Sequence, residues 1–337
     1  MSPQPREVEL RFCRLLCTGK VDAAAVLLET HPDLLRRSVH CAAAWGDADC
    51  VADHLERDAA CANALLGATW SPLLLLSLSH CARPDSPRAA GTSRAAQLLL
   101  AHAADVGATH PDGELPAGHI TSLAAAAGIT GNRDLCRALL DAGAPPNDGA
   151  ALFVAAAEQH WDCVAEIVAG GGDLNATDTG GRFTPLHWML DLRYTRPALD
   201  RILAEGADPN VRAGVLQETA LHVAVRRRRV ETLEPLHRAG ADLNARTVGG
   251  MTAYRHALRR SFTEVVDKLA EMGADVTTSN GDDLAVALLA GRLDVARALL
   301  EKNPSLVPSD VPEEARLVAA FCPKTRSRCD ATIYGAV

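Results

Sequence analysis

A short phrase recurs along this chain at a nearly constant interval. Residues 206–210 read Gly-Ala-Asp-Pro-Asn, and residues 240–244 read Gly-Ala-Asp-Leu-Asn, 34 residues later. The phrase returns as Gly-Ala-Asp-Val at residues 273–276. Looser copies stand at residues 103–106, 143–147 and 171–175. A period near 33 residues indicates stacked copies of one small unit, each touching only its neighbours, rather than separate globular domains.

The residues between two copies of the phrase predict a pair of helices. A threonine precedes the first apolar stretch of a unit, as Thr219 does, and a glycine follows the second, as Gly240 does. Threonine is a favoured helix N-cap, and glycine is favoured just after a helix ends. We therefore expect helices over 220–225 and 230–239, with Pro235 kinking or shortening the second of them.

The openings of the best copies resemble the ankyrin repeat. Residues 184–187 read Thr-Pro-Leu-His and residues 219–222 read Thr-Ala-Leu-His, and each is followed by a Gly-Ala-Asp-x-Asn phrase. The resemblance implies an all-α solenoid whose units each combine a β-turn finger with two antiparallel helices. The order of helix, turn and helix also resembles that of bacterial ankyrin proteins of unknown role.

The strength of this resemblance divides the chain into sections. We expect about nine units in an ankyrin-repeat solenoid over residues 1–307. The units match best over 184–276, less well over 121–175 and 282–307, and by helix pairs alone over 8–110. Residues 308–337 are expected to form a capping helix and a loose tail. Two segments rich in Pro and Gly interrupt the rhythm: we expect 81–93 to separate the two helices of one unit and 107–119 to lengthen a turn. Each is either a tolerated surface loop or part of a binding face.

Composition points to a small aliphatic core in a soluble protein. Hydrophobic residues make up 48% of the chain but aromatic residues only 4%, which suits closely packed helices. The ten cysteines stand mostly in apolar contexts, where a free thiol behaves as a small hydrophobe. The first residues lack the apolar core of a signal peptide, and the longest apolar run, 150–157, is too short to span a bilayer. We therefore expect a cytoplasmic protein that contacts no membrane.

Positive charge is concentrated in one part of this acidic chain. Residues 181–260 carry fourteen arginines against eight acidic residues, although the whole chain has a net charge of −8. In the repeat alignment, the residues that close successive first helices share one wall of a concave groove: Asp191, Leu192, Arg226, Arg227, Arg259 and Arg260. We expect all four arginines of this wall to be exposed. Arginine pairs bidentately with carboxylates, so the wall predicts an acidic partner. Alternatively, the arginine stems only cover apolar helix surface.

The residues just before the helix openings form a second candidate set. Phe183, Glu218 and Met251 directly precede the three threonines that start the best units. Resemblance to the family places them at the junction of finger and helix, facing the groove. An apolar pair beside arginines suits a partner that is both apolar and acidic, and packing between neighbouring turns is the alternative reading.

The histidines offer a weaker indication of chemistry. The resemblance gives His187 and His222 a structural role, since each matches the histidine of the family motif. An enzyme would need acid–base groups in the groove or beneath the 107–119 segment, and His119, His187 and Asp191 are the candidates. No spacing typical of metal ligands or of a phosphate-binding loop occurs, so we expect no metal or cofactor.

These observations favour a non-catalytic module that binds another protein along the groove. An enzyme acting on a small molecule is the first alternative. A protein that confers immunity by neutralising a toxin is a special case of the binding module. Nucleic acid is a poor fit, because the net charge is negative and aromatic residues for base stacking are scarce. The identity of the partner and the oligomeric state stay open.

Overall fold

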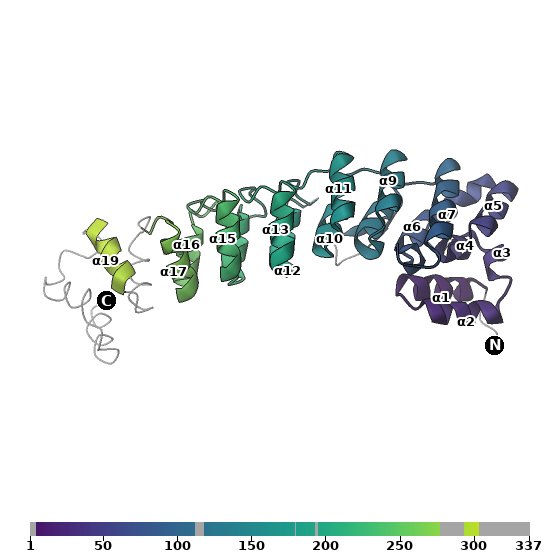
Figure 1. Cartoon of the computed structure of the whole chain (residues 1–337), viewed down its shortest axis with the longest axis horizontal. Helices are drawn as coiled ribbons and strands as arrows, with labels where there is room; N and C mark the ends of the chain where they lie inside the picture. Colours follow the sequence, from purple (N-terminus) through teal and green to yellow (C-terminus); the bar gives the residue numbers. More distant parts are fainter. Residues whose placement is uncertain (1–4, 112–117, 179, 193–194, 277–292, 303–337) are drawn as a thin grey trace. The chain divides into compact units, whose positions relative to one another are not determined.

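The structure is a computed structural model that describes residues 5–111, 118–178, 180–192, 195–276 and 293–302 (Figure 1). The predicted capping helix and tail over 308–337, and most of the predicted terminal unit, lie outside the described residues. The chain divides into two compact units, each larger than a single repeat. Below, the first unit is residues 1–215, the second unit is residues 216–337, and one helix pair with its loop is called a repeat.

The first unit consists of antiparallel helix pairs that stand side by side (Figure 1). Its helices are α1 (Pro5–Cys17), α2 (Val21–Thr30), α3 (Leu34–Arg37), α4 (Val39–Trp45), α5 (Ala48–Arg57), α6 (Pro72–Leu78), α7 (Ala89–Ala101), α8 (Ser122–Ala124), α9 (Arg133–Asp141), α10 (Ala151–Ala157), α11 (Trp161–Ala169), α12 (Pro185–Leu192) and α13 (Arg196–Ala204). Two 3-10 turns, η1 (Ala59–Asn63) and η2 (His80–Ala82), and one π-helical turn, η3 (Ala125–Thr130), complete the set.

The second unit continues the same pattern. Its helices are α14 (Ala220–Arg226), α15 (Val230–Arg238), α16 (Ala253–Arg259), α17 (Thr263–Glu271) and α19 (Leu293–Lys302). In α14 and α15 the predicted bounds hold to within one residue. Pro235, expected to kink or shorten the second helix, lies inside α15 without ending it, so the helix is not shortened there. Pro235 is buried, and packing outweighs the local penalty of its missing N–H. The all-α fold of paired helices is confirmed.

Polar side chains at the first turns explain where the helices begin. Ser38 accepts a hydrogen bond from the backbone N–H of Cys41 at the start of α4, and Asn132 does the same at the start of α9. Thr219 forms a capping box with His222 at the start of α14. These caps satisfy N–H groups that would otherwise lack a partner inside the helix.

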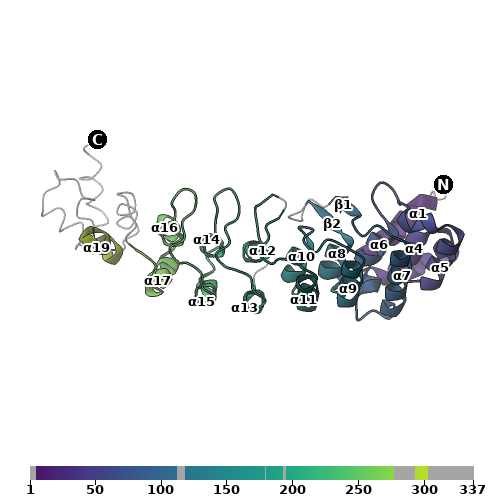
Figure 2. The same ribbon diagram turned by 90° about the horizontal axis from the view of Figure 1, so that it is seen from above.

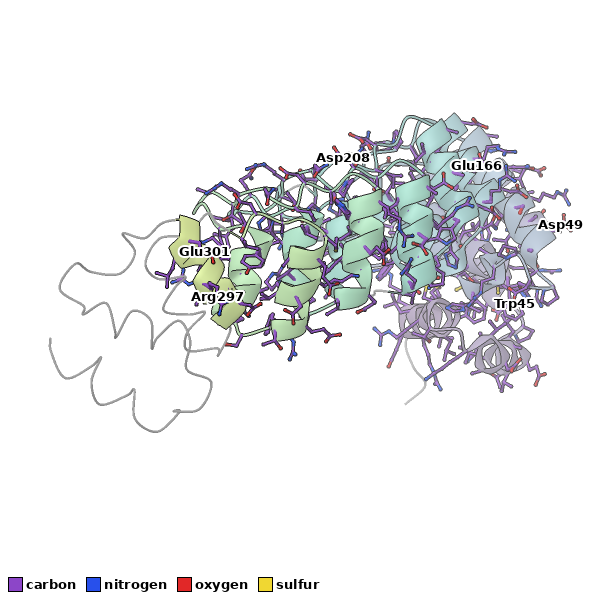
Figure 3. All side chains as sticks on the ribbon, turned by 60° about the vertical axis from the view of Figure 1, so that its left-hand side comes forward. Trp45, Asp49, Glu166, Asp208, Arg297 and Glu301 are labelled. Carbon is purple, nitrogen blue, oxygen red and sulfur yellow. The ribbon has the colours of Figure 1, made fainter. Side chains whose placement is uncertain are left out.

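The recurring phrase has a direct structural meaning. The carboxylate of Asp208 accepts the N–H of Asn210, two residues later, which fixes the turn after each second helix (Figure 3). The Asn of the preceding phrase, Asn175, accepts the N–H of Asp208 at 2.7 Å. In the second unit Asn244 accepts the N–H of Asp275 in the same way, also at 2.7 Å. The Asp therefore shapes its own turn, and the Asn binds the corresponding turn of the next repeat.

A one-residue insertion is absorbed by the π-helical turn η3. The residue in the left-handed conformation between two helices is Gly131 in this pair and Arg228 in the pair that starts at Thr219. Gly131 lies one residue further from its cap, Thr121, than Arg228 lies from Thr219. A π-turn widens a helix by one residue, so the second helix keeps its place in the stack.

The two interrupting segments differ in the structure. Residues 107–119 were expected to lengthen a turn, and the described part adds a short antiparallel pair, β1 (Thr109–Pro111) and β2 (His119–Thr121). Residues 81–93 were expected to separate two helices, but α7 already begins at Ala89, so the irregular part is shorter. Both segments therefore carry more regular structure than their Pro and Gly content indicates.

The amino-terminal helices cross two repeats rather than stacking as a simple first unit. Helix α1 packs against α4, α6 and η2. The ring of Phe12 lies 5.7 Å from that of Trp45, and Phe12 and Leu16 are fully buried. The face of α4 and α6 beneath α1 is thus already covered by the chain itself.

The left-handed position between two helices offers a test of backbone strain. Ser261 occupies it in the second unit with φ 56°, a conformation that L-residues adopt at a cost and glycine adopts freely. We expect Ser261→Gly to raise the free energy of unfolding by about 0.5–1 kcal/mol, measured by urea denaturation. Arg228→Gly is the comparison: its φ is 55°, but its guanidinium lies 4.8 Å from the ring of Phe262, and losing that contact offsets the gain. A larger gain for Arg228→Gly than for Ser261→Gly would contradict this account.

Candidate partner-binding surface

The ends of two consecutive first helices present arginines. Helix α14 ends at Arg226 and is followed by Arg227, while α16 ends at Arg259 and is followed by Arg260. Arg227, Arg259 and Arg260 are exposed. A helix C-terminus carries partial negative charge, so these cations also stabilise the helices that they close. The predicted pairs Arg226–Arg227 and Arg259–Arg260 therefore lie at equivalent places in two consecutive repeats, as the alignment indicated.

Arg226 differs from the other three arginines. Its Nη2 lies 3.4 Å from Oε2 of Glu218, and the two side chains are only 30% and 17% exposed. The expectation that all four arginines are exposed was therefore wrong for Arg226. Glu218, predicted to face a partner, instead forms an ion pair within the unit. The acceptor was a predicted site residue, but the pairing depends on a side-chain conformation that the sequence does not specify.

Charge is divided between the two sides of the second unit. Helices α14 and α16, with the residue that follows each, contain no acidic residue and five arginines: Arg226, Arg227, Arg255, Arg259 and Arg260. Helices α15 and α17 contain five acidic residues and two basic ones: Glu231, Glu234, Glu264, Asp267, Glu271, Arg238 and Lys268. We call the first set, Arg226, Arg227, Arg255, Arg259 and Arg260, the basic face. Figure 2 shows α14 and α16 beside the protruding loops, and α15 and α17 on the other side.

His256 lies among these arginines and was not identified from the sequence. Burial lowers the pKa of its imidazole, and the charge of Arg260 lowers that pKa further. Glu218 acts in the opposite direction. His256 therefore adds less positive charge to the basic face than an exposed histidine would at the same pH.

The loop tips of the second unit carry apolar side chains. Leu216 is 58% exposed and Val248 is 72% exposed, and each lies in the turn of a loop that precedes a first helix. The N–H of Val248 donates to the carbonyl of Leu216 at 3.0 Å. The predicted site residues Glu218 and Met251 lie a few residues further along these loops, and the tips themselves were not predicted. The signal was available, because turn residues are usually polar.

The remaining predicted groove residues divide between the two units. Met251 is half-buried, and its carbonyl accepts a hydrogen bond from Nε2 of His222 at 3.0 Å. Phe183, Asp191 and Leu192 belong to the first unit, where Leu192 is exposed and the other two are half-buried. They are thus not part of the basic face as defined here.

The histidines at the helix starts are structural. Nδ1 of His187 lies 2.7 Å from the hydroxyl of Thr184, and the residue is 1% exposed. His222 is bonded in the same way to Thr219 and links to the next loop through Met251. His119 lies on β2, in a different element from His187. A buried ring that is occupied in this way cannot contact a substrate in a groove, so the enzyme alternative loses His187.

Outside these surfaces, the described chain has few features of reactive sites. The eight cysteines in the described residues are free thiols, and Cys13 is buried in the core as expected. The same residues contain no cluster of three metal-ligating side chains. None of the described helices combines the length and the apolar character needed to cross a bilayer.

An acid–arginine cluster joins two second helices of the first unit. Glu166 of α11 accepts hydrogen bonds from Arg133 and Arg137 of α9, with Arg133 Nε 2.7 Å and Arg137 Nε 3.0 Å from the nearest carboxylate oxygen (Figure 3). The hydrogen bond from Arg137, then that from Arg133, lowers the pKa of Glu166 to about 2. This cluster is a contact between repeats rather than a free surface.

The depressed pKa of Glu166 predicts how stability changes with pH. A carboxyl that is more acidic in the folded than in the unfolded chain stabilises above its unfolded pKa and loses that contribution as pH falls toward the folded value. We expect the melting temperature of Glu166→Gln to lie below that of the wild type at pH 7, and the gap to close as pH falls from about 5 to 2. Glu29→Gln, at an exposed position on α2, serves as the control. A gap for Glu166→Gln that does not change with pH would rule out the ion cluster as its cause.

Comparison with known proteins follows the repeat. A family model described as ankyrin repeats (3 copies) matches residues 186–280 and again 221–310. The human ankyrin repeat and SOCS box protein 16 is 32% identical over 134 residues, which cover 37% of this chain and 29% of that protein. The Arabidopsis thaliana E3 ubiquitin-protein ligase KEG is 26% identical over 246 residues, 58% of this chain and 15% of that protein. The matched region thus spans less than a third of either relative.

The crystal structure of the human ASB11 ankyrin repeat domain aligns with 69% of this chain and 96% of its own, at 22% identity and a TM-score of 0.49.

Proposed function

Since this chain is an ankyrin-repeat protein, we propose that it is a non-catalytic module that binds another protein, and that the basic face of the second unit receives an acidic surface of that partner. Ankyrin repeats generally act in protein–protein interaction. What is specific to this chain is the positive charge of the proposed binding surface. The special case of a toxin-neutralising protein would use the same surface.

One observation carries the proposal: basic and acidic side chains are sorted onto different helices of the same unit. The first helices α14 and α16 with their closing residues hold five arginines and no acidic residue, while the second helices α15 and α17 hold five acidic residues and two basic ones. Three of the arginines, Arg227, Arg259 and Arg260, are exposed. Like charges gathered on one side repel one another, and an acidic partner removes that repulsion.

The enzyme alternative has less support. His187 is buried and bonded to Thr184, and the carboxylate of Glu218 is held by Arg226 of the basic face. A general acid or base must reach the reacting proton, and neither group is open to the solvent side of the helices. The proposal therefore needs only an open surface of complementary charge.

Ionic strength tests the proposal directly. The chain is immobilised, proteins are captured from the native lysate in low salt, and the captured proteins are identified after elution with rising salt. We expect the retained proteins to be acidic and to elute between about 0.1 and 0.5 M salt, because exposed ion pairs are screened in that range. Capture of the same proteins, unchanged across that salt range and without acidic character, would refute the proposal.

A further inference from the structure

The second unit exposes apolar side chains in only one kind of place. Among its described residues, the large hydrophobic side chains that are exposed are Leu216 and Val248. Each lies at the tip of a loop that leads into a first helix, and Figure 2 shows these loops extending away from the helices beside α14 and α16. Single exposed apolar residues are common, but two at equivalent tips form a local feature.

The two tips are held together rather than left independent. The N–H of Val248 donates to the carbonyl of Leu216 at 3.0 Å. The second loop is closed by hydrogen bonds from Thr247 to Met251 at 3.0 Å and from Gly250 to Thr247 at 2.9 Å, both through the backbone. Because the backbone of these loops is already ordered, they lose little conformational entropy when a partner covers the two side chains.

The tips are also continuous with the basic face. Glu218 stands two residues after Leu216, and its carboxylate reaches the guanidinium of Arg226, at the last turn of α14. A chain that covers Leu216 therefore meets the arginines at the ends of α14 and α16 next.

We propose that Leu216 and Val248 form an apolar anchor for the partner of the basic face, and that this partner presents a polypeptide segment with a bulky apolar side chain beside acidic residues. The inference rests on the proposed function and specifies the partner further. The apolar side chain packs on the two tips, and the acidic residues pair with Arg227, Arg259 and Arg260. Charge complementarity selects an acidic segment, and the tips select its apolar residue.

Two peptide arrays test the inference on the full-length chain. In one array every peptide carries Leu or Phe among Asp and Glu residues, and in the other Ser replaces each Leu or Phe. We expect the wild type to bind the first array about tenfold more tightly, since burying one large apolar side chain contributes about that factor. The variant L216S/V248S should lose this preference and keep the weaker binding to the serine array. Val26→Ser, which alters a side chain of α2 that is also 58% exposed, is the matched control and should behave as wild type.

The outcomes separate the two levels of the proposal. If wild type and L216S/V248S bind both arrays equally well, the apolar anchor is wrong and the acidic partner stands. If neither array binds, while vesicles containing phosphatidylserine do, both the anchor and the acidic protein partner are wrong. If neither probe binds, both proposals fail. Circular dichroism checks that L216S/V248S is folded. Serine at two exposed turn positions should leave the helical signal unchanged.

Discussion

Replacing Leu236 with alanine is expected to lower the free energy of unfolding by about 2–5 kcal/mol, and Leu221→Ala should do the same. Leu236 of α15 and Leu221 of α14 are 0% and 1% exposed. Each truncation removes three buried carbon atoms, so the favourable free energy of transferring them out of water is lost. It also leaves a cavity that closely packed helices cannot fill. The measurement is equilibrium denaturation in urea followed by the helical signal.

The size of the effect follows from the repeat architecture. Each repeat of such a fold contacts only the repeats on either side of it, so the loss of one shared Leu weakens both interfaces of its repeat. Val248→Ala is the matched control, because it also truncates an aliphatic side chain, but one that is 72% exposed. We expect that control to stay within about 0.5 kcal/mol of the wild type. If all three variants unfold at the same denaturant concentration as the wild type, the buried stripe has been assigned to the wrong residues.

The helices that the sequence predicted well are those with local start and stop signals. Thr219 and Gly240 mark the limits of a helix pair whose observed bounds differ from the predicted ones by one residue. A cap acts through hydrogen bonds to residues within one turn, so its effect can be read without knowledge of the rest of the fold. The same locality explains why the family resemblance was clearest where these signals are complete.

Features that depend on tertiary contacts were missed or misjudged. Pro235 was expected to kink or shorten a helix, but α15 continues past it, because its buried position compensates for the lost hydrogen bond. The path of α1 across α4 and α6 depends on apolar contacts such as Phe12 with Trp45, between residues far apart in the chain. No local pattern contains that information.

The candidate site was predicted in outline but not in detail. Position in the repeat was enough to place Arg227, Arg259 and Arg260 at exposed helix ends. It was not enough to identify the ion pair of Arg226 with Glu218, because both partners have long side chains with several accessible rotamers. The apolar tips were not predicted, although Leu216 and Val248 each stand in a turn, where polar residues are more common.

Reversing the exposed charge of the basic face should have the largest effect on binding. We expect the variant R227E/R259E/R260E to capture its partner at least about a hundredfold more weakly, because three attractive charge pairs become repulsive ones. Arg226 is left unchanged, since a glutamate there would face Glu218 and confuse loss of binding with loss of stability. The quantity measured is the dissociation constant for the partner identified by capture, at one fixed salt concentration.

A second variant separates position from total charge. R238E/K268E/R297E makes the same change in net charge on α15, α17 and α19, none of which contributes to the basic face. Arg238 and Lys268 pair with Glu234 and Glu271, so circular dichroism first checks that this variant is folded. It should bind the partner as the wild type does. The triple variant of the basic face loses favourable interactions with two helix C-termini, worth about 0.3–1 kcal/mol each, so a small fall in melting temperature is expected without unfolding. If R227E/R259E/R260E stays folded and binds the partner with unchanged affinity, the basic face is not the binding surface, and the segments 81–93 and 107–119 become the next surfaces to alter.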